Sequence, residues 1–387
     1  MAKRKRSSAK PSARKKAPRK RSVRLPKIIV VAGAGFSAPL GYSTLYDFES
    51  AITRYAPTAK PHERKALERL FLQIKRSLVA KGEFTDIEAI MAELSKYVEL
   101  WDNLRKDHFL KQEFLSTVGD RFRFSAFAQH AIQARSIVDK FMGEHYGQFS
   151  DDEEAMASVF GFLEELTNLN GGVLDFFTTN YDVGLEGIWN SVPTKMKLIT
   201  GAIKRRDGTV RWDPSRLDVM KDQRKGVYVH RLHGCVRWYE DSGANDSRDR
   251  LCNVVSVSIN SEDRPEDRQP CVMYPGRKLR GSQSPFVEGL TNLRGMLGRV
   301  EQCIIIGTSF RDDDILECLI KANDGRERPL KLIIINTANV KERFNTRVQQ
   351  VIANRGFLYE DHKWEPLILV GSYLDKRVRV ELRSLVK

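Results

Sequence analysis

The sequence predicts an α/β fold, with a Rossmann-like parallel sheet that carries helices on both faces and an inserted helical module. Three observations predict it. Apolar runs rich in β-branched residues each end in a polar or glycine-rich turn. The last two of these units follow one another at the spacing of a βαβ repeat. Residues 59–169, between the first two units, carry apolar side chains at helical spacing instead.

The first unit is a short apolar run that leads directly into a glycine-rich turn. Residues 27–32 read Lys-Ile-Ile-Val-Val-Ala, which is typical of a strand buried in a parallel sheet. Residues 33–38 fit the G-x-G-x-x-G/A form of a dinucleotide-binding turn, in which glycines let the backbone approach a pyrophosphate. An ordinary tight turn is the alternative. No acidic ribose ligand stands about 20 residues further on, which disfavours a standard dehydrogenase.

The inserted module is expected to be a small helical bundle. One stretch places Leu70, Ile74 and Leu78 at helical spacing, and a second does so with Ile90 and Leu94. Further helical stretches are expected at about 125–142 and 153–168. Core packing within the bundle is the simplest interpretation of these stripes.

The second unit delivers polar side chains to the carboxyl end of a predicted strand at 173–177. It is followed by Thr178, Thr179, Asn180, Tyr181 and Asp182. Ligands bind at this edge of open α/β sheets, and the Asn180 amide can hold a water or a ribose hydroxyl. The alternative is a polar turn in which Asp182 caps the next segment.

A third cluster places histidines near a strand end at residues 228–234. His233 ends this strand just before a glycine, where an imidazole can enter a cleft and transfer protons near neutral pH. His230 and the remaining histidines are interpreted as structural. The polar stretch 240–270 is expected to be a loop.

The last two units complete the sheet. Residues 303–306 form an apolar run that is followed by Gly307, Thr308 and Ser309, and the run at 332–335 is followed by Asn336.

In this order the motifs resemble those of the SIR2 (sirtuin-like) family. In their individual residues they are most similar to the bacterial SIR2-like proteins of antiphage defence. The resemblance covers about residues 27–58 and 170–340. It rests on the Gly-Ala-Gly-x-Ser turn at 33–37, Thr-x-Asn-x-Asp at 178–182, Leu-His-Gly at 232–234, Gly-x-Ser at 307–309 and Asn336.

The resemblance implies a role for each matching residue. Asn180 would position the attacking water or the ribose, and His233 would be the general base. Asp182 would lie near the nicotinamide. The implied NAD+-binding set is Gly33, Ala34, Gly35, Ser37, Thr179, Asn180, Asp182, Gly307, Thr308, Ser309 and Asn336, with the first four on the phosphates and Ser309 and Asn336 on the adenosine half.

Two departures from the protein deacylases of this family bear on the reaction. Deacylases carry a zinc module with two Cys-x-x-Cys pairs, whereas the five cysteines here form no such pair, so no metal is expected. The arginine-bearing loop after the first turn is replaced by a different sequence at 39–48. Both differences argue against deacylation and for water as the acceptor.

The resemblance therefore implies an NAD+ glycohydrolase that releases nicotinamide and ADP-ribose, with NAD+ as substrate. As an antiphage effector it would be activated by assembly into a homo-oligomer or by a partner protein of the ATPase/helicase or Argonaute type. Two alternatives stay open: an NAD-dependent protein deacylase or ADP-ribosyltransferase, and a non-catalytic scaffold subunit that binds NAD or ADP-ribose in a nucleic-acid complex.

Charge divides the 387 residues into a basic tail at 1–26 and a near-neutral body at 27–387. The tail holds 12 of the Lys and Arg residues and no acid, which leaves 15 − 12 = +3 for the body. Such a segment is expected to be disordered. It could be a non-specific nucleic-acid-binding arm, a nuclear localisation signal or a solvated extension without a specific role. No apolar run is long enough to span a membrane, and the unpaired cysteines suit a cytoplasmic protein.

Deleting residues 1–26 should weaken any binding to DNA or RNA and leave NAD+ chemistry unchanged. Flexible Lys and Arg side chains neutralise phosphates and release counterions, so the affinity of the full chain should fall steeply as salt rises. Fluorescence polarisation over a salt series, with both forms and two unrelated sequences, measures this. Equal affinity and equal salt slope for the two forms would show that the tail takes no part.

Overall fold

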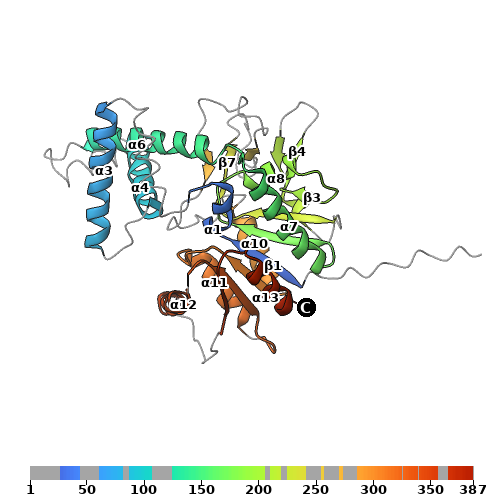
Figure 1. Ribbon diagram of the computed structural model, residues 1–387. Coiled ribbons are helices and arrows are strands. Elements are labelled where there is room, and N and C mark those ends of the chain that lie inside the picture. Colours follow the sequence, from blue (N-terminus) through green and yellow to red (C-terminus); the bar gives the residue numbers. More distant parts are fainter. Residues whose placement is uncertain are drawn as a thin grey trace, which may run out of the picture.

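A seven-stranded parallel sheet forms the centre of the computed structural model (Figure 1). The strand order is β12-β11-β10-β1-β2-β6-β3, and every neighbouring pair is parallel. The strands are β1 (Ile28–Ala32), β2 (Val173–Thr178), β3 (Lys197–Ile199), β6 (Gly226–Arg231), β10 (Gln302–Ile306), β11 (Lys331–Asn336) and β12 (Leu367–Val370). The predicted fold class is confirmed.

The structure describes most of the chain. The described residues are 27–43, 61–81, 87–106, 124–204, 210–218, 225–240, 254–256, 270–272, 286–324, 326–338, 340–355 and 365–386. The predicted basic tail at 1–26 lies outside them. No helix in these ranges is both long and apolar enough to cross a membrane.

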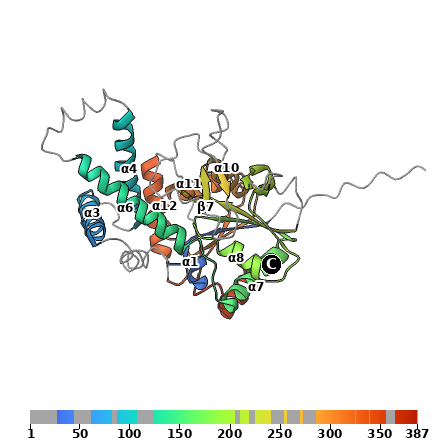
Figure 2. The ribbon, with the colours of Figure 1, turned by 90° about the horizontal axis from the view of Figure 1, so that it is seen from above.

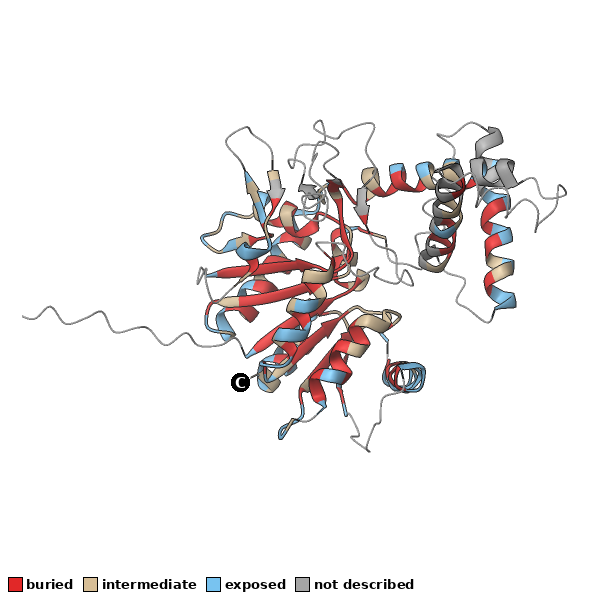
Figure 3. Ribbon diagram, turned by 180° about the vertical axis from the view of Figure 1, so that it is seen from behind, coloured by how far each residue is buried: buried red, intermediate tan, exposed pale blue. Residues whose placement is uncertain are grey.

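Helices cover both faces of the sheet because its central strands are apolar on both sides. Along β1, Val30 belongs to the apolar cluster on one face and Val31 to the cluster on the other. The first face is covered by α7 (Glu153–Leu169), α8 (Gly184–Ser191) and α13 (Lys376–Val386). The second is covered by α10 (Phe286–Leu297), α11 (Asp313–Asn323) and α12 (Lys341–Arg355). Figure 3 shows the central strands almost wholly buried.

The helical module consists of α3 (Pro61–Ala80), α4 (Ile87–Lys106) and α6 (Phe124–His145). These three helices pack on one another beside the sheet, and the C-terminal end of α6 reaches the body of the molecule (Figures 1 and 2). The predicted stripes are buried in it, as at Ile74, Leu78 and Leu94. The fourth helix of the predicted insertion, α7, lies against the parallel sheet instead.

A second, antiparallel sheet was not anticipated. Its order is β4-β5-β8-β7-β9. The strands are β4 (Ala202–Lys204), β5 (Val210–Trp212), β7 (Gly234–Glu240), β8 (Val254–Ser256) and β9 (Pro270–Val272). The prediction of a continuous loop over 240–270 was therefore wrong at β8. A strand of three residues carries too little periodicity to be recognised in the sequence.

Strand β1 lies at the point where the order of the strands in the sheet reverses. On one side of β1 the sheet continues with β10 and β11, and on the other side it continues with β2 and β6. Backbone hydrogen bonds join the turns at this point. The Gly33 amide donates to the Ile306 carbonyl at 2.9 Å, and the Thr179 amide donates to the Ala32 carbonyl at 3.0 Å. Such a division point is where open α/β sheets bind ligands.

Two turns meet so closely here that neither tolerates a side chain. A Cβ on Gly307 would lie 2.5 Å from the Gly35 Cα, and Gly307 has φ +61. Gly307→Ala should therefore lower the free energy of unfolding by about 1–3 kcal/mol. Gly161→Ala, in open space on α7, is the control and should raise it by up to about 1 kcal/mol. Urea denaturation measures both. An unchanged stability for Gly307→Ala would contradict the close approach.

Candidate functional site

A cavity of about 410 Å³ lies over the carboxyl ends of the central strands. This volume falls in the range of sites for small molecules and cofactors. The structure brings all the residues of the predicted site to its wall. They are Gly33, Ala34, Gly35, Ser37, Thr179, Asn180, Asp182, His233, Gly307, Thr308, Ser309 and Asn336.

The glycine-rich turn forms the floor of the cavity. A Cβ on Gly33 would lie 2.8 Å from the Gly307 carbonyl oxygen, and one on Gly35 would lie 2.7 Å from the Gly307 Cα. Packing of the two turns therefore accounts for both glycines without a ligand. The turn also lines the cavity, and a glycine-rich turn of this form lets an anionic group approach its backbone.

Ser37 joins the glycine turn to the polar loop after β2. Its hydroxyl accepts a hydrogen bond from Asn180 Nδ2 at 2.8 Å and also bonds to the Asp182 carboxylate. Asp182 accepts the Gly184 amide at 2.9 Å. Burial raises the pKa of Asp182, against the lowering effect of Arg231 and of these hydrogen bonds. The Asp182 side chain thus lines the cavity and also accepts a backbone amide of the loop to which it belongs.

A buried arginine holds the backbone of this loop. Arg231, at the end of β6, donates to the carbonyl oxygens of Asn180 at 3.3 Å and Asp182 at 2.8 Å. Its other nitrogen contacts both oxygens of Glu186 at 2.6 Å. Only 2% of the Arg231 side chain is exposed, so Glu186 provides the charge that such a buried guanidinium needs.

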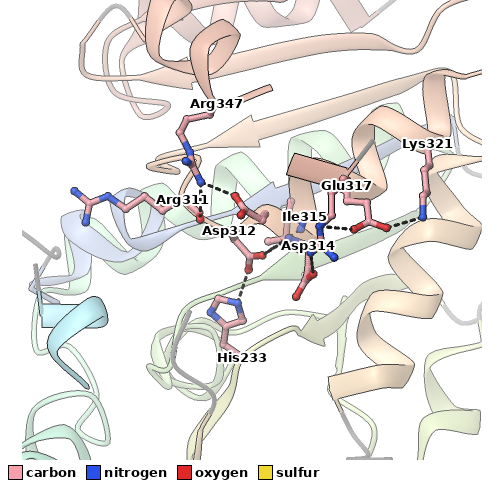
Figure 4. Close-up of polar contacts among 10 residues, drawn as sticks. His233, Arg311, Asp312, Asp314, Ile315, Glu317, Lys321 and Arg347 are labelled. Carbon is pink, nitrogen blue, oxygen red and sulfur yellow. Dashed lines mark hydrogen bonds and ion pairs between the residues drawn. The ribbon is translucent and has the colours of Figure 1, made fainter. Parts of the chain in front are cut away.

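His233 is paired with a carboxylate from the segment that follows β10. Its Nε2 lies 2.6 Å from Asp312 Oδ2, as Figure 4 shows. Burial alone would raise the pKa of Asp312. The hydrogen bond from His233, the charge of that ring and two backbone amides lower it below its ordinary value instead. Asp312 also lines the cavity and was not among the predicted site residues.

The far end of the cavity is formed by the turns after β10 and β11. Asn336 Nδ2 donates to the Thr308 carbonyl at 3.2 Å, and both residues line the cavity beside Ser309. In the sheet, β11 is separated from β2 by β10 and β1. Asn336 and Asn180 therefore stand on strands about 14 Å apart. The cavity is long enough to receive a ligand with two ends.

The helical module contributes an apolar wall that the sequence did not reveal. Met91 of α4, Met142 of α6 and Tyr146, which directly follows α6, line the cavity. The Tyr146 hydroxyl donates to the Ser43 carbonyl at 3.0 Å, and the His145 ring bonds to the Ser43 hydroxyl at 2.9 Å. Burial lowers the pKa of His145, which keeps its ring neutral. These contacts fix the end of α6 to the chain beside the glycine turn.

His230 has the structural role that was expected of it. Its Nε2 lies 2.9 Å from Asp175 Oδ1 in the core between β6 and β2. The imidazole stacks on Phe177 at a centroid distance of 4.3 Å. Neither His230 nor Asp175 lines the cavity.

The described residues offer little for a metal ion. Within the ranges given above, no three His, Cys, Asp or Glu side chains come together in a group that could hold one. Cys235, Cys303 and Cys318 are separate, buried thiols. Burial raises the pKa of Cys235 to about 11, which keeps that thiol protonated.

The sequence matches no protein-family model and no curated protein. Among solved structures, a variant Sir2 homologue in complex with ADP-ribose has 14% identity and a TM-score of 0.38, over 86% of this chain and 94% of that chain. A Sir2 enzyme has 14% identity and a TM-score of 0.36, over 93% and 94%. A Sir2 protein bound to an acetylated peptide has 12% identity and a TM-score of 0.32, over 85% and 93%. Similarity at this level transfers no activity and no residue role to this chain.

Removing Arg231 should destabilise the protein far more than neutralising its partner. Arg231→Ala leaves two carbonyls and a carboxylate without their donor and should cost about 3–5 kcal/mol of unfolding free energy. Glu186→Gln keeps an acceptor oxygen and should cost about 1–3 kcal/mol. Glu301→Gln, in the exposed pair with Lys27 at 4.0 Å, is the control at about 0.5 kcal/mol or less. Urea denaturation ranks the three. Equal losses would contradict the role of Arg231 as the central donor.

Proposed function

We propose that the protein is an NAD+ glycohydrolase, which converts NAD+ and water to nicotinamide and ADP-ribose. One observation carries the proposal: Asn180 and His233 line the same cavity as the glycine turn at its floor and Asn336 at its far end. An imidazole, an amide and a glycine turn therefore line one cavity, which supports binding and cleavage of a dinucleotide there.

The arrangement favours one orientation of the dinucleotide. The diphosphate would lie on the turn that contains Gly33 and Gly35, because this turn fits the G-x-G-x-x-G/A form and lines the cavity. The adenosine half would extend towards Ser309 and Asn336. The nicotinamide riboside would extend towards Asn180, Asp182 and His233, where an amide, an acid and an imidazole line the same part of the wall.

Cleavage in this orientation passes through a ribose cation. When the glycosidic bond breaks, its electron pair stays on the nicotinamide nitrogen, and nicotinamide leaves as a neutral molecule. Fixed dipoles and the Asp182 carboxylate, when ionised, would stabilise the positive charge that develops on the sugar. The Asn180 amide, oriented by Ser37, would hold a water or a ribose hydroxyl, and His233 would accept the proton that is released.

Water is the acceptor that the residues favour over an acylated lysine. The cysteines supply no Cys-x-x-Cys pair for a zinc module. The helical module places Met91, Met142 and Tyr146 on the cavity wall. A deacylase or an ADP-ribosyltransferase is the alternative enzyme, and a scaffold that binds NAD without cleaving it is the alternative outside catalysis.

An NADase of this kind must be inactive until it is triggered. We expect activation by assembly into a homo-oligomer or by a partner protein of the ATPase/helicase or Argonaute type, in an antiphage effector. This part of the proposal rests on the sequence resemblance alone.

Asn180→Ala and His233→Ala should each reduce nicotinamide release by about 10²-fold or more, because each removes a group that acts on the reacting atoms. Asn190→Ala on α8 and His130→Ala on α6, both exposed, are matched controls that should retain full turnover. Release from NAD+ is followed with purified protein, alone and with the product of the neighbouring gene, and thermal melts confirm folding. Wild-type turnover in either site variant would remove that residue from the proposed mechanism.

The same assay separates the alternatives. O-acetyl-ADP-ribose formed from an acetyl-lysine peptide would identify a deacylase. ADP-ribose attached to protein would identify a transferase. Tight NAD+ binding without cleavage under activating conditions would identify a scaffold.

A further inference from the structure

We propose that the adenosine end of the cavity receives a 2′-phosphate, so that NADP+ is a substrate of this site and is bound in preference to NAD+. Arg343 of α12 would bind the added phosphate. This inference rests on the proposed function, which places the adenosine half of the dinucleotide beside Asn336.

A guanidinium group stands at this end of the cavity. Arg343 lines the cavity together with Asn336, the last residue of β11, and Thr337, which follows it. Arg343 belongs to the first turn of α12, the helix that comes after β11 along the chain. The strand that brings Asn336 to the far end of the cavity is therefore followed by the helix that brings a cation to the same end.

The acids of the cavity wall belong to the other end. Among the wall residues that the structure describes, the carboxylates are those of Asp182 and Asp312. Asp182 accepts the Gly184 amide in the loop after β2, and Asp312 is paired with His233. Sites that select NAD+ place an acid on the 2′-hydroxyl, and such an acid would repel a phosphate. Sites for NADP+ place an arginine nearby instead.

The charges next to Arg343 are compatible with a bound phosphate. Glu342 precedes it in α12 but does not line the cavity, since successive residues of a helix point in different directions. The N-terminus of α12 carries positive partial charge, which favours an anion. Arg343 is also exposed, so it can meet a phosphate without the cost of burying either charge.

A second guanidinium group on the wall has a different place. Arg311 lines the cavity and follows β10, which lies between β11 and β1 in the sheet. Figure 4 shows the Arg311 side chain directed away from the pair of His233 and Asp312. Because Arg311 comes from a strand next to the glycine turn, we expect its charge to act on the diphosphate. NAD+ and NADP+ share that diphosphate, so Arg311 would not distinguish them.

The added phosphate leaves the chemical step unchanged. The bond between the anomeric carbon and the nicotinamide nitrogen breaks with its electron pair on that nitrogen, and the oxygen of water forms the new bond to the carbon. One proton is released. The 2′-phosphate stays on the product, which is 2′-phospho-ADP-ribose.

Binding of the two products tests the inference without any cleavage. Isothermal titration calorimetry compares 2′-phospho-ADP-ribose with ADP-ribose on the full chain. The wild type should bind the phosphorylated product about 10-fold more tightly or better, because charge-assisted hydrogen bonds to a guanidinium are added. Arg343→Gln should bring the ratio of the two affinities close to one, with the loss on the phosphorylated product.

Two further variants show whether the preference belongs to Arg343. Arg355→Gln, at the other end of α12 and outside the cavity wall, is the matched control and should keep the wild-type ratio. Arg311→Gln should weaken the binding of both products and also keep the ratio. Equal affinities in the wild type, an unchanged ratio in Arg343→Gln or no binding of either product would overturn the inference. So would loss of the preference in Arg355→Gln or Arg311→Gln.

Nicotinamide release separates this inference from the proposed function. The value of kcat/KM for NADP+ should exceed that for NAD+ by about 10-fold or more, and Arg343→Gln should remove this difference. The expected ratios in binding, without release from either dinucleotide, would contradict only the proposed function. Release from NAD+ together with equal binding of the two products would contradict only the inference.

Discussion

The backbones of Gly35 and Gly307 touch in the turns that follow β1 and β10, and the shape of the cavity depends on this contact. The Gly35 amide donates to the Gly307 carbonyl at 3.0 Å, and a Cβ on either residue would collide with the other turn. Because β1 lies between β10 and β2, any widening here would also displace the Thr179 amide from the Ala32 carbonyl. The loop that carries Asn180 would move with it. The packing of Gly35 against Gly307 thus fixes the distance between the floor of the cavity and the loop that carries Asn180.

Around this floor the molecule buries charge only where a partner meets it. Arg231 holds the loop of Asn180 and Asp182 by its backbone and is neutralised by Glu186. Asp312 is paired with His233 on the cavity wall. Such pairs contribute little to stability compared with apolar residues, but a lone member is very costly. They are retained at a site where the direction of a side chain matters more than its contribution to folding.

Local patterns were sufficient to predict β1, β2, β6, β10 and β11, the glycine turn and the polar residues that follow these strands on the cavity wall. Parallel strands bring their carboxyl ends to one edge, so a polar residue after each apolar run, such as Asn180 or Asn336, had to lie there. Contacts between side chains could not be predicted in this way. His233 and Asp312 are 79 residues apart, and the spacing of neither indicates the other. Met91 and Met142 follow helical spacing as core residues do, so their place on the cavity wall depends on how the module packs.

The most direct test of the proposed site is a crystal structure with a non-hydrolysable NAD+ analogue. The account predicts that the diphosphate lies on the turn at 33–37. The adenosine would lie beside Asn336, and the anomeric carbon of the nicotinamide riboside would lie within reach of Asn180 and His233. An analogue bound outside this cavity, or bound in it with the nicotinamide beside Asn336, would contradict the account.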